Sequence, residues 1–304
     1  MKNFLLALIA VLSVSFSLTT YAADAPSEAL LKVINGKHRS KENQLRDQYR
    51  HPAETLTFFN VQDDMTVVEV APGKGWYTEI LAPYLREKGK LYAAHFSPGN
   101  PADYAKQNLK IFLDKLHGNP KLYDTVELTV LEPPTDVQIA PEGSADRVLT
   151  FRNVHNWIAN DQASAVFNAM FKALKPGGML GVVEHRGLAH RPQDPKAVSG
   201  YVTEDYVIAL ARKAGFEFLA KSEINANPKD AKNYQEGVWT LPPTLRLKDK
   251  DKEKYLAIGE SDRMTLKFLK PVPKSLASFL PTTLFVSTDR TNFPEIPSVI
   301  HKNE

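Results

Sequence analysis

Short apolar runs alternate with longer amphipathic stretches along most of this chain, and the two patterns predict different secondary structures. The run 65–70, MTVVEV, is rich in β-branched and apolar residues around Glu69 and has the length of a buried strand. Six later runs have the same character, so the chain is predicted to form seven strands. They lie at 65–70, 89–96, 124–131, 145–151, 179–185, 216–224 and 263–269.

Between these runs, apolar residues recur at every third or fourth position, which predicts helices with one buried face. The clearest helix runs from Ala163 to Leu174, and KPGG at 175–178 ends it. Another begins at Asn100-Pro101, a favourable N-cap and first-turn pair, and a third covers 204–214. Strands that alternate with helices predict an α/β fold, a mostly parallel sheet with helices on both faces. The last two strands have no clear helix between them, which favours an antiparallel hairpin at one edge.

The stretch EVAPGKG places a carboxylate and two glycines at the end of the first strand, where ligands bind in parallel sheets. Gly73 and Gly75 allow a tight turn and a close approach of the backbone to a ligand. The helix that follows has free N–H groups near Trp76 and Tyr77, which attract anionic groups. The pattern is neither G-x-G-x-x-G nor a P-loop, so an ordinary glycine-containing turn is the alternative interpretation.

Two other strand ends carry groups suited to catalysis, in FRNVHNW (151–157) and VEHRG (183–187). His155 is expected to act as a general base or to orient substrate, although it could also be a loop histidine bonded to a backbone carbonyl. His185 could face the same site, and Asn153 either joins this catalytic group or caps the loop. With Glu184 the histidines could hold a metal, but no H-x-x-x-H spacing supports one and none is predicted. The predicted substrate contacts are Arg50, His51, Arg152, Asn156, Trp157 and Glu184.

The N-terminal residues predict export. Lys2 precedes an apolar run at 4–18, and small residues follow at Ala22 and Ala23, which is the order of a secretory signal. We expect residues 1–22 to be a signal peptide cleaved near Ala22 or Ala23, leaving a soluble periplasmic chain with no membrane span. An uncleaved anchor is the alternative.

Two segments outside the main pattern are predicted to play supporting roles. Residues 23–60 are expected to form a helical lid segment that carries Arg50 and His51. GESDRM, 259–264, opens the last strand and is predicted to form a structural ion-pair network, either at the opposite end of an antiparallel strand or in a loop that reaches back. Residues 271–304 contain five prolines and are expected to form a loosely packed tail.

Composition narrows the possible function classes. With 304 residues, of which 43% are hydrophobic, the chain can bury the core of one large domain without disulfides. It has no cysteine, which excludes thiol chemistry and cysteine metal sites. Its net charge of +3, or +2 without Lys2, is close to balance and argues against a nucleic-acid-binding protein.

The stretch VVEVAPGKGWYTEIL, 67–81, resembles motif I of the class I S-adenosylmethionine-dependent methyltransferases, with Ala71 in place of the usual first glycine. The segments 47–59, 146–157 and 237–268 are similar to one branch of that family, predicted methyltransferases that carry secretion signals. The resemblance implies a Rossmann-like seven-stranded sheet in the order 3-2-1-4-5-7-6, with the last strand antiparallel, in a domain spanning 61–270.

This resemblance also implies S-adenosyl-L-methionine as the cofactor and methyl transfer to a small-molecule acceptor. An acid usually ends the second strand in this family, and here His95 or Ser97 would have to replace it. Glu132, after the third strand, could face the adenine or be a solvated loop acid. The residues implied around the cofactor are Glu69, Ala71, Pro72, Gly73, Gly75, Trp76, Tyr77, His95 and Ser97.

The same fold can serve other functions. The main alternative is an exported ligand-binding or differently catalytic protein that keeps the fold without using S-adenosylmethionine, because that cofactor is made in the cytoplasm. A hydrolase that uses His155 or His185 is a weaker alternative, because the chain has no G-x-S-x-G motif. No pattern in the sequence indicates the acceptor or the oligomeric state.

Overall fold

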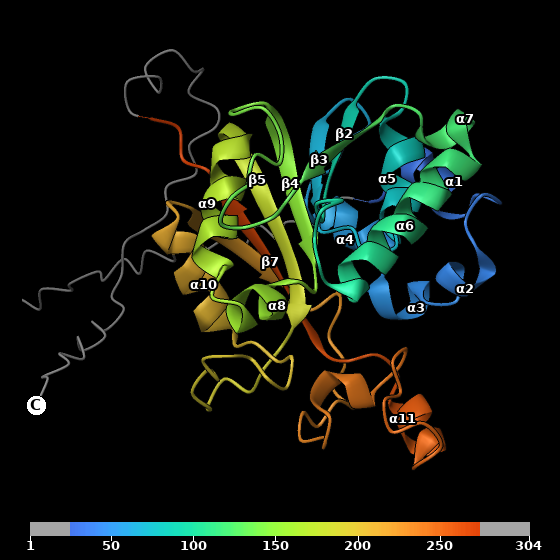
Figure 1. The fold of residues 1–304 in the computed structure, drawn as a ribbon, viewed down its shortest axis with the longest axis vertical. Helices are drawn as coiled ribbons and strands as arrows, with labels where there is room; N and C mark the ends of the chain where they lie inside the picture. The colour runs from blue at the N-terminus through green and yellow to red at the C-terminus, as the bar shows by residue number, and fades with distance from the viewer. Residues whose placement is uncertain (1–24, 274–304) are drawn as a thin grey trace, which may run out of the picture.

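The computed structural model describes residues 25–273, and its centre is a seven-stranded sheet (Figure 1). The strand order is β3-β2-β1-β4-β5-β7-β6, and β7 runs antiparallel to both of its neighbours. The predicted α/β fold, strand order and antiparallel last strand are therefore confirmed. The predicted signal peptide and most of the predicted tail lie outside the described residues. The strands are β1 Thr66–Val70, β2 Lys90–His95, β3 Val126–Val130, β4 Ala145–Phe151, β5 Leu174–His185, β6 Glu217–Ser222 and β7 Arg263–Leu269.

Helices cover both faces of the sheet (Figure 1). None of the helices within residues 25–273 has both the length and the apolar character needed to cross a membrane. Their bounds are α1 Glu28–Ile34, α2 Lys41–Gln44, α3 Asp47–Arg50, α4 Pro52–Phe58, α5 Thr78–Leu85, α6 Asp103–Gly118, α7 Pro120–Tyr123, α8 Val154–Ala159, α9 Ala163–Ala173, α10 Glu204–Lys213 and α11 Lys252–Ile258, with a short 3₁₀ helix η1 at Gly237–Thr240.

Successive side chains of each strand point to opposite faces, and this alternation divides the core in two. Val67 of β1 lies in one core with Leu30 of α1 and Ile80 of α5. Val68, the next residue, lies in the other core with Met170 of α9. Each of these side chains is fully or almost fully buried, and burial of this kind stabilises the fold by about 1.5–3 kcal/mol per side chain.

Three local predictions are wrong. Helix α6 begins after Ala102, because the side chain of Asn100 accepts a hydrogen bond from the Ala102 amide and does not cap the helix. Strand β5 begins at Leu174, which pairs with Ala145, so KPGG lies within the strand. The last two strands, β6 and β7, do pair antiparallel at one edge of the sheet as predicted, but helix α11 lies between them in the chain, where no helix was expected.

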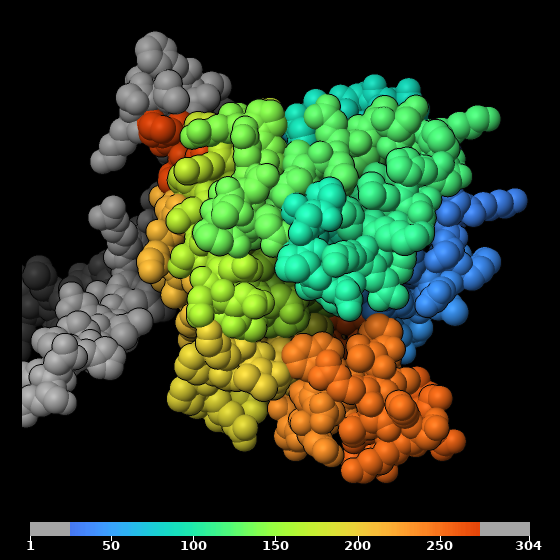
Figure 2. Space-filling view, viewed as in Figure 1, coloured from blue at the N-terminus to red at the C-terminus, as the bar shows by residue number. Residues whose placement is uncertain are grey.

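The GESDRM segment lies at the carboxyl edge of the parallel strands and not at the opposite end of the sheet, the first of its two predicted positions. Because β7 runs antiparallel, its first residue, Arg263, pairs with His185, the last residue of β5. The predicted ion pairs do form, between Glu260 and neighbouring arginines. Helices α2, α3 and α11 gather near the same edge, toward which the β4 and β5 arrowheads point (Figure 1). The yellow and orange segments of the chain form a lobe there (Figure 2).

Candidate active site

The loop after β1 exposes its backbone at one glycine and packs it at the other. Ala71, Gly73 and Gly75 have φ angles of 53°, 58° and 76°, all in the left-handed region. A Cβ on Gly75 would lie 3.1 Å from Phe112 of α6, so only glycine fits there without a shift. A Cβ on Gly73 would meet nothing within 4 Å. A ligand can therefore approach the backbone at Gly73, while Gly75 holds the loop against α6.

Glu69 is a buried carboxylate, 2% exposed, at the start of this loop. The hydroxyl of Thr78 donates to its Oε2 at 2.6 Å, and its Oε1 has no hydrogen-bond partner within residues 25–273. Burial raises the pKa of Glu69 to about 7, although Thr78 and Lys115 favour the ionised form. A ligand amine or hydroxyl at Oε1 would supply a donor that this carboxylate lacks.

His95 ends β2, and both of its ring nitrogens are used within the protein. Its Nε2 lies 2.9 Å from the Gly73 carbonyl, and its Nδ1 accepts a hydrogen bond from the Phe96 amide at 2.8 Å. Because a carbonyl only accepts, the Nε2 atom carries the proton. Burial lowers the pKa of His95, against the opposing effect of the Gly73 carbonyl. His95 therefore supports the loop backbone and offers no free nitrogen to a ligand.

Glu132 brings a carboxylate from the end of β3 to the segment that follows β2. Its oxygens accept hydrogen bonds from the backbone amide of Ser97 at 3.3 Å and the side chain of Asn100 at 2.8 Å. The Ser97 hydroxyl in turn accepts a hydrogen bond from the Gly99 amide at 3.1 Å. Glu132 is half-buried and orders the turn after β2.

His155 and Glu184 form a hydrogen-bonded pair where β4 and β5 end. Glu184 is fully buried, and its Oε1 lies 3.0 Å from Nδ1 of His155. The same carboxylate accepts hydrogen bonds from the backbone amides of Val154, His155 and His185 at 2.5 to 3.3 Å. An ionised carboxylate only accepts, so Nδ1 of His155 carries the proton and its Nε2 atom keeps a lone pair. This arrangement suits a general base.

His185 lies beside this pair, with its ring centroid 5.3 Å from that of His155. Its Nδ1 lies 2.5 Å from the hydroxyl oxygen of Ser261. Desolvation, followed by the charges of His155 and Arg152, lowers the pKa of His185 well below its usual value, so the ring is neutral at pH 7. Trp239 of η1 meets the ring of His155 edge-on, with the ring centroids 6.0 Å apart.

The ligand atoms of His155, Glu184 and His185 lie within 4.8 Å of one another, a spacing at which a metal could bind. N–H groups already use both oxygens of Glu184, and a metal would have to displace them. Nearby arginines, Arg152 among them, lower the pKa of His185 and would equally oppose a metal cation. The donor set therefore fits proton transfer better than metal binding.

Asn153 connects the end of β4 to the loop after β1. Its side-chain amide donates to the carbonyls of Val70 and Ala71 at 3.2 and 3.3 Å, and to the Thr150 hydroxyl at 3.1 Å. These bonds consume its N–H groups, so Asn153 is placed to hold the loop in register with the histidine pair. It is a positioning residue in this arrangement.

The N-terminal helices lie against the same loop. The indole N–H of Trp76 donates to the Asn43 carbonyl at 3.2 Å, and the guanidinium groups of Arg39 and Arg50 lie 4.9 and 4.5 Å from the centroid of its ring. The hydroxyl of Tyr77 donates to the Arg50 carbonyl at 3.4 Å, and its ring stacks on Phe151 at the end of β4. The segment therefore covers one side of the loop, which is the position expected of a lid.

Some predicted substrate residues do not join this group. Trp157 is 6% exposed and lies in the core beneath α9, with Phe167 as a ring neighbour. Asn156 is exposed on α8, and His51 is half-buried between α3 and α4. Trp239 and Ser261 contact the histidines but were not among the predicted site residues. The direction of β7 was the signal that could have found Ser261, since an antiparallel last strand begins at the carboxyl edge.

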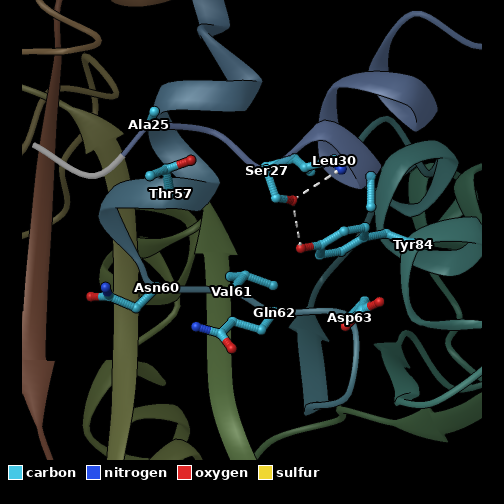
Figure 3. Close-up of a pocket in the computed structure, with 10 residues that line it drawn as sticks. Ala25, Ser27, Leu30, Thr57, Asn60, Val61, Gln62, Asp63 and Tyr84 are labelled. Carbon is cyan, nitrogen blue, oxygen red and sulfur yellow. Dashed lines mark hydrogen bonds between the residues drawn. The ribbon is translucent and has the colours of Figure 1, made fainter.

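Two surface cavities lie away from these residues. One, of about 390 Å³, is at the amino end of β1, where Ser27 and Tyr84 form a hydrogen bond above Gln62 and Asp63 (Figure 3). The other, of about 200 Å³, is formed by the segment after β5 and includes Lys232. Neither includes a predicted site residue, so the candidate site rests on the side-chain geometry described above.

Solved structures share this arrangement of strands and helices. The [4+2]-cyclase SpnF superposes with a TM-score of 0.52 at 15% identity, over 80% of this chain and 93% of that one. The chain has the Rossmann-like seven-stranded fold of the class I methyltransferases, because its strand order is 3-2-1-4-5-7-6 and its last strand is antiparallel. A methyltransferase from Aquifex aeolicus described as SAM-dependent matches at 16% identity and a TM-score of 0.48, over 74% of this chain and 92% of that one.

A further similar structure is Haemonchus contortus phosphoethanolamine N-methyltransferase 2 in complex with S-adenosyl-L-methionine. It matches at 16% identity and a TM-score of 0.48, over 73% of this chain and 53% of that one. No protein-family model and no curated protein matches this sequence. At these identities the likeness concerns the fold alone, and function has to be argued from the site.

Proposed function

We propose that this protein is an S-adenosylmethionine-dependent methyltransferase that acts on a small-molecule acceptor. The observation that carries the proposal is the pairing of His155 with Glu184 at the strand ends that adjoin an open glycine loop. The loop fits the cofactor because its backbone is accessible at Gly73. The unpartnered Oε1 of Glu69 also suits a cationic amine. The proposed cofactor residues remain those predicted, with His95 acting through the backbone of Gly73.

When bound, the cofactor supplies an electrophilic methyl group on a sulfonium, and transfer depends mainly on alignment with the acceptor. Nε2 of His155 takes the proton from an acceptor hydroxyl or amine. Glu184 fixes the tautomer of His155 and stabilises the positive charge that the ring then gains. The neutral ring of His185 lies beside His155 and lines the site with an uncharged polar group.

The rival proposal is a ligand-binding or differently catalytic protein on the same fold. The end of β2 favours it, because His95 stands where this fold usually places a ribose-binding acid and has no free nitrogen. One solved structure of similar fold is described as a cyclase and not as a methyltransferase, which also supports the rival.

The test is methyl transfer from methyl-labelled cofactor to fractionated small-molecule extracts. The protein should label at least one fraction, and His155→Gln should reduce the rate by about 10²–10⁴-fold, the usual effect of losing a general base. Binding of S-adenosylhomocysteine should be unchanged in that variant. Gly118→Ala serves as the control, because a Cβ there meets nothing within 4 Å. Cofactor binding without labelling of any fraction would favour the rival.

We also propose that residues 1–22 are removed during export and that the mature chain works in the periplasm, with residues 23–60 as its lid. The order of charged, apolar and small residues at the N-terminus supports this. Mass measurement of the intact protein from cell fractions tests it. A periplasmic chain that begins near Ala23 is expected, and a full-length cytoplasmic chain would contradict it.

A further inference from the structure

Four arginines surround one carboxylate at the carboxyl edge of the sheet. Arg46, Arg50, Arg152 and Arg263 are called the arginine cluster below. Glu260 is 2% exposed, and its oxygens lie 2.6 Å from Nε of Arg46, 3.6 Å from Nε of Arg50, and in contact with Arg263. Burial opposes ionisation of Glu260, but the charges of Arg263 and Arg50 outweigh it and hold its pKa well below the usual range. One carboxylate is therefore the shared ion-pair partner of three guanidinium groups.

Several N–H groups of the arginine cluster have no acceptor. Nε and Nη1 of Arg50, Nη2 of Arg46 and Nε of Arg263 are buried and make no hydrogen bond within residues 25–273. The side chain of Arg152 makes no hydrogen bond or ion pair with the described part of the chain. Buried N–H groups are nearly always bonded, and a buried charge without a counter-charge is costly. The cluster is therefore equipped for acceptor atoms that the described chain does not supply.

The charges at this place are unbalanced. Four guanidinium groups lie around one carboxylate, Glu260, so positive charge is in excess. Burial and the charge of Arg263 lower the pKa of Arg152 to about 10, so the arginines repel one another. Water could satisfy the free N–H groups but not the excess charge. The planar donors of arginine suit carboxylate and phosphate oxygens.

The arginine cluster lies between the proposed cofactor loop and the histidine pair. The guanidinium of Arg50 lies 4.5 Å above the ring of Trp76 in the loop. Arg263 pairs with His185 across β5 and β7. Arg152 has a φ of 62° and follows directly after β4, three residues before His155. An anion bound here would sit beside both the loop and the general base.

We propose that the arginine cluster binds an oxyanion on the methyl acceptor, a carboxylate or a phosphate, so that the acceptor is an acidic small molecule. This inference rests on the proposed methyltransferase function. The anion would anchor one end of the acceptor and leave its nucleophile at Nε2 of His155.

The experiment is calorimetric titration of the full chain with malonate and with inorganic phosphate at constant ionic strength, with and without saturating S-adenosylhomocysteine. Arg152→Gln is the test variant, because Arg152 makes no ion pair whose loss could unfold the protein. Arg152→Lys keeps the charge, and Arg212→Gln, at an exposed position on α10, is the matched control. Malonate and phosphate separate a carboxylate acceptor from a phosphate acceptor.

The proposal predicts that one probe binds saturably in the presence of S-adenosylhomocysteine. Arg152→Gln should weaken that binding by about ten- to a hundredfold, the loss of one charge-assisted hydrogen bond. Arg152→Lys should weaken it less, and Arg212→Gln should leave it unchanged. S-adenosylhomocysteine should bind Arg152→Gln as it binds the natural chain.

Two results would overturn the proposal. The first is the absence of saturable binding of either probe. The second is that S-adenosylhomocysteine displaces the probe whereas 5′-methylthioadenosine, which lacks the amino-acid part, does not. In that case the arginine cluster holds the carboxylate of the cofactor itself. If the probes bind through Arg152 but S-adenosylhomocysteine does not bind at all, the anion site stands and the methyltransferase proposal fails.

Discussion

Replacing Glu69 by glutamine should stabilise the protein at alkaline pH while damaging its proposed function. Burial raises the pKa of Glu69 from 4.5 to about 7, so ionisation is less favourable in the folded chain than in the unfolded one. The folded state then holds the extra proton between these two values, and stability falls as the pH rises through this window. At about 1.4 kcal/mol per pKa unit, the ionised carboxylate costs the fold about 3 kcal/mol above pH 7.

Glutamine resembles the protonated acid and can still accept the hydrogen bond from Thr78, so Glu69→Gln should escape this cost. Denaturant unfolding of both proteins at pH 5 and pH 8 measures the difference. The variant should gain about 2.5 kcal/mol relative to the natural chain between the two pH values, because a small part of the effect is already present at pH 5. Other titrating groups are common to both proteins and cancel. An identical pH dependence in the two proteins would refute the assigned environment of Glu69.

Three further predictions concern the fold around the site. Glu260→Gln should lower the free energy of unfolding by about 3–5 kcal/mol, because three arginines lose their buried anionic partner. The ionised carboxylate stabilises the fold fully above about pH 4.5, and this stabilisation disappears as the pH falls into the acid range. A loss under about 1 kcal/mol in urea unfolding at neutral pH would contradict the prediction. Glu184→Gln should lower the free energy of unfolding by about 2–4 kcal/mol, because an amide N–H group would then face backbone N–H donors. Thermal unfolding measures this loss, and an unchanged melting temperature would contradict it. Gly75→Ala should cost about 1–3 kcal/mol through its positive φ and its contact with Phe112, whereas Gly118→Ala should be near neutral; equal stability of the two variants would argue against the loop geometry.

The strands, and the strand ends that carry His155 and Glu184, could be predicted because their signals are local. The run 145–151 is a strand in the structure with the predicted bounds, since a buried strand requires consecutive apolar residues. His155 and Glu184 lie at the ends of neighbouring parallel strands, and such ends meet at one edge of a sheet. Their contact therefore follows from topology.

The arginine cluster could not be predicted, because its members are far apart in the chain. Arg46 and Glu260 are separated by 214 residues and meet only after β7 has inserted beside β5. No local pattern specifies that insertion. Helix α11 is equally hidden, because its sequence KEKYLAI follows a run of charged residues that has the composition of a loop.

Other differences from the predictions arise where a side chain has several possible partners and the tertiary structure decides which of them it contacts. Asn100 has the properties of a helix cap, but its amide donates to Glu132 and its oxygen accepts from Ala102, so the helix starts later. Trp157 lies in a polar sequence that favours a binding role, yet α8 turns it into the core. These outcomes depend on tertiary neighbours that the sequence does not place.

The proposed cofactor site is best tested by calorimetric titration of the purified protein with S-adenosylmethionine and S-adenosylhomocysteine. Gly73→Val is the test variant, because its side chain would enter the open space before the loop, and Gly118→Ala is the control. We expect micromolar binding, about −8 kcal/mol, that is lost in Gly73→Val and retained in Gly118→Ala. A folded natural chain that binds neither compound would contradict the proposed cofactor site.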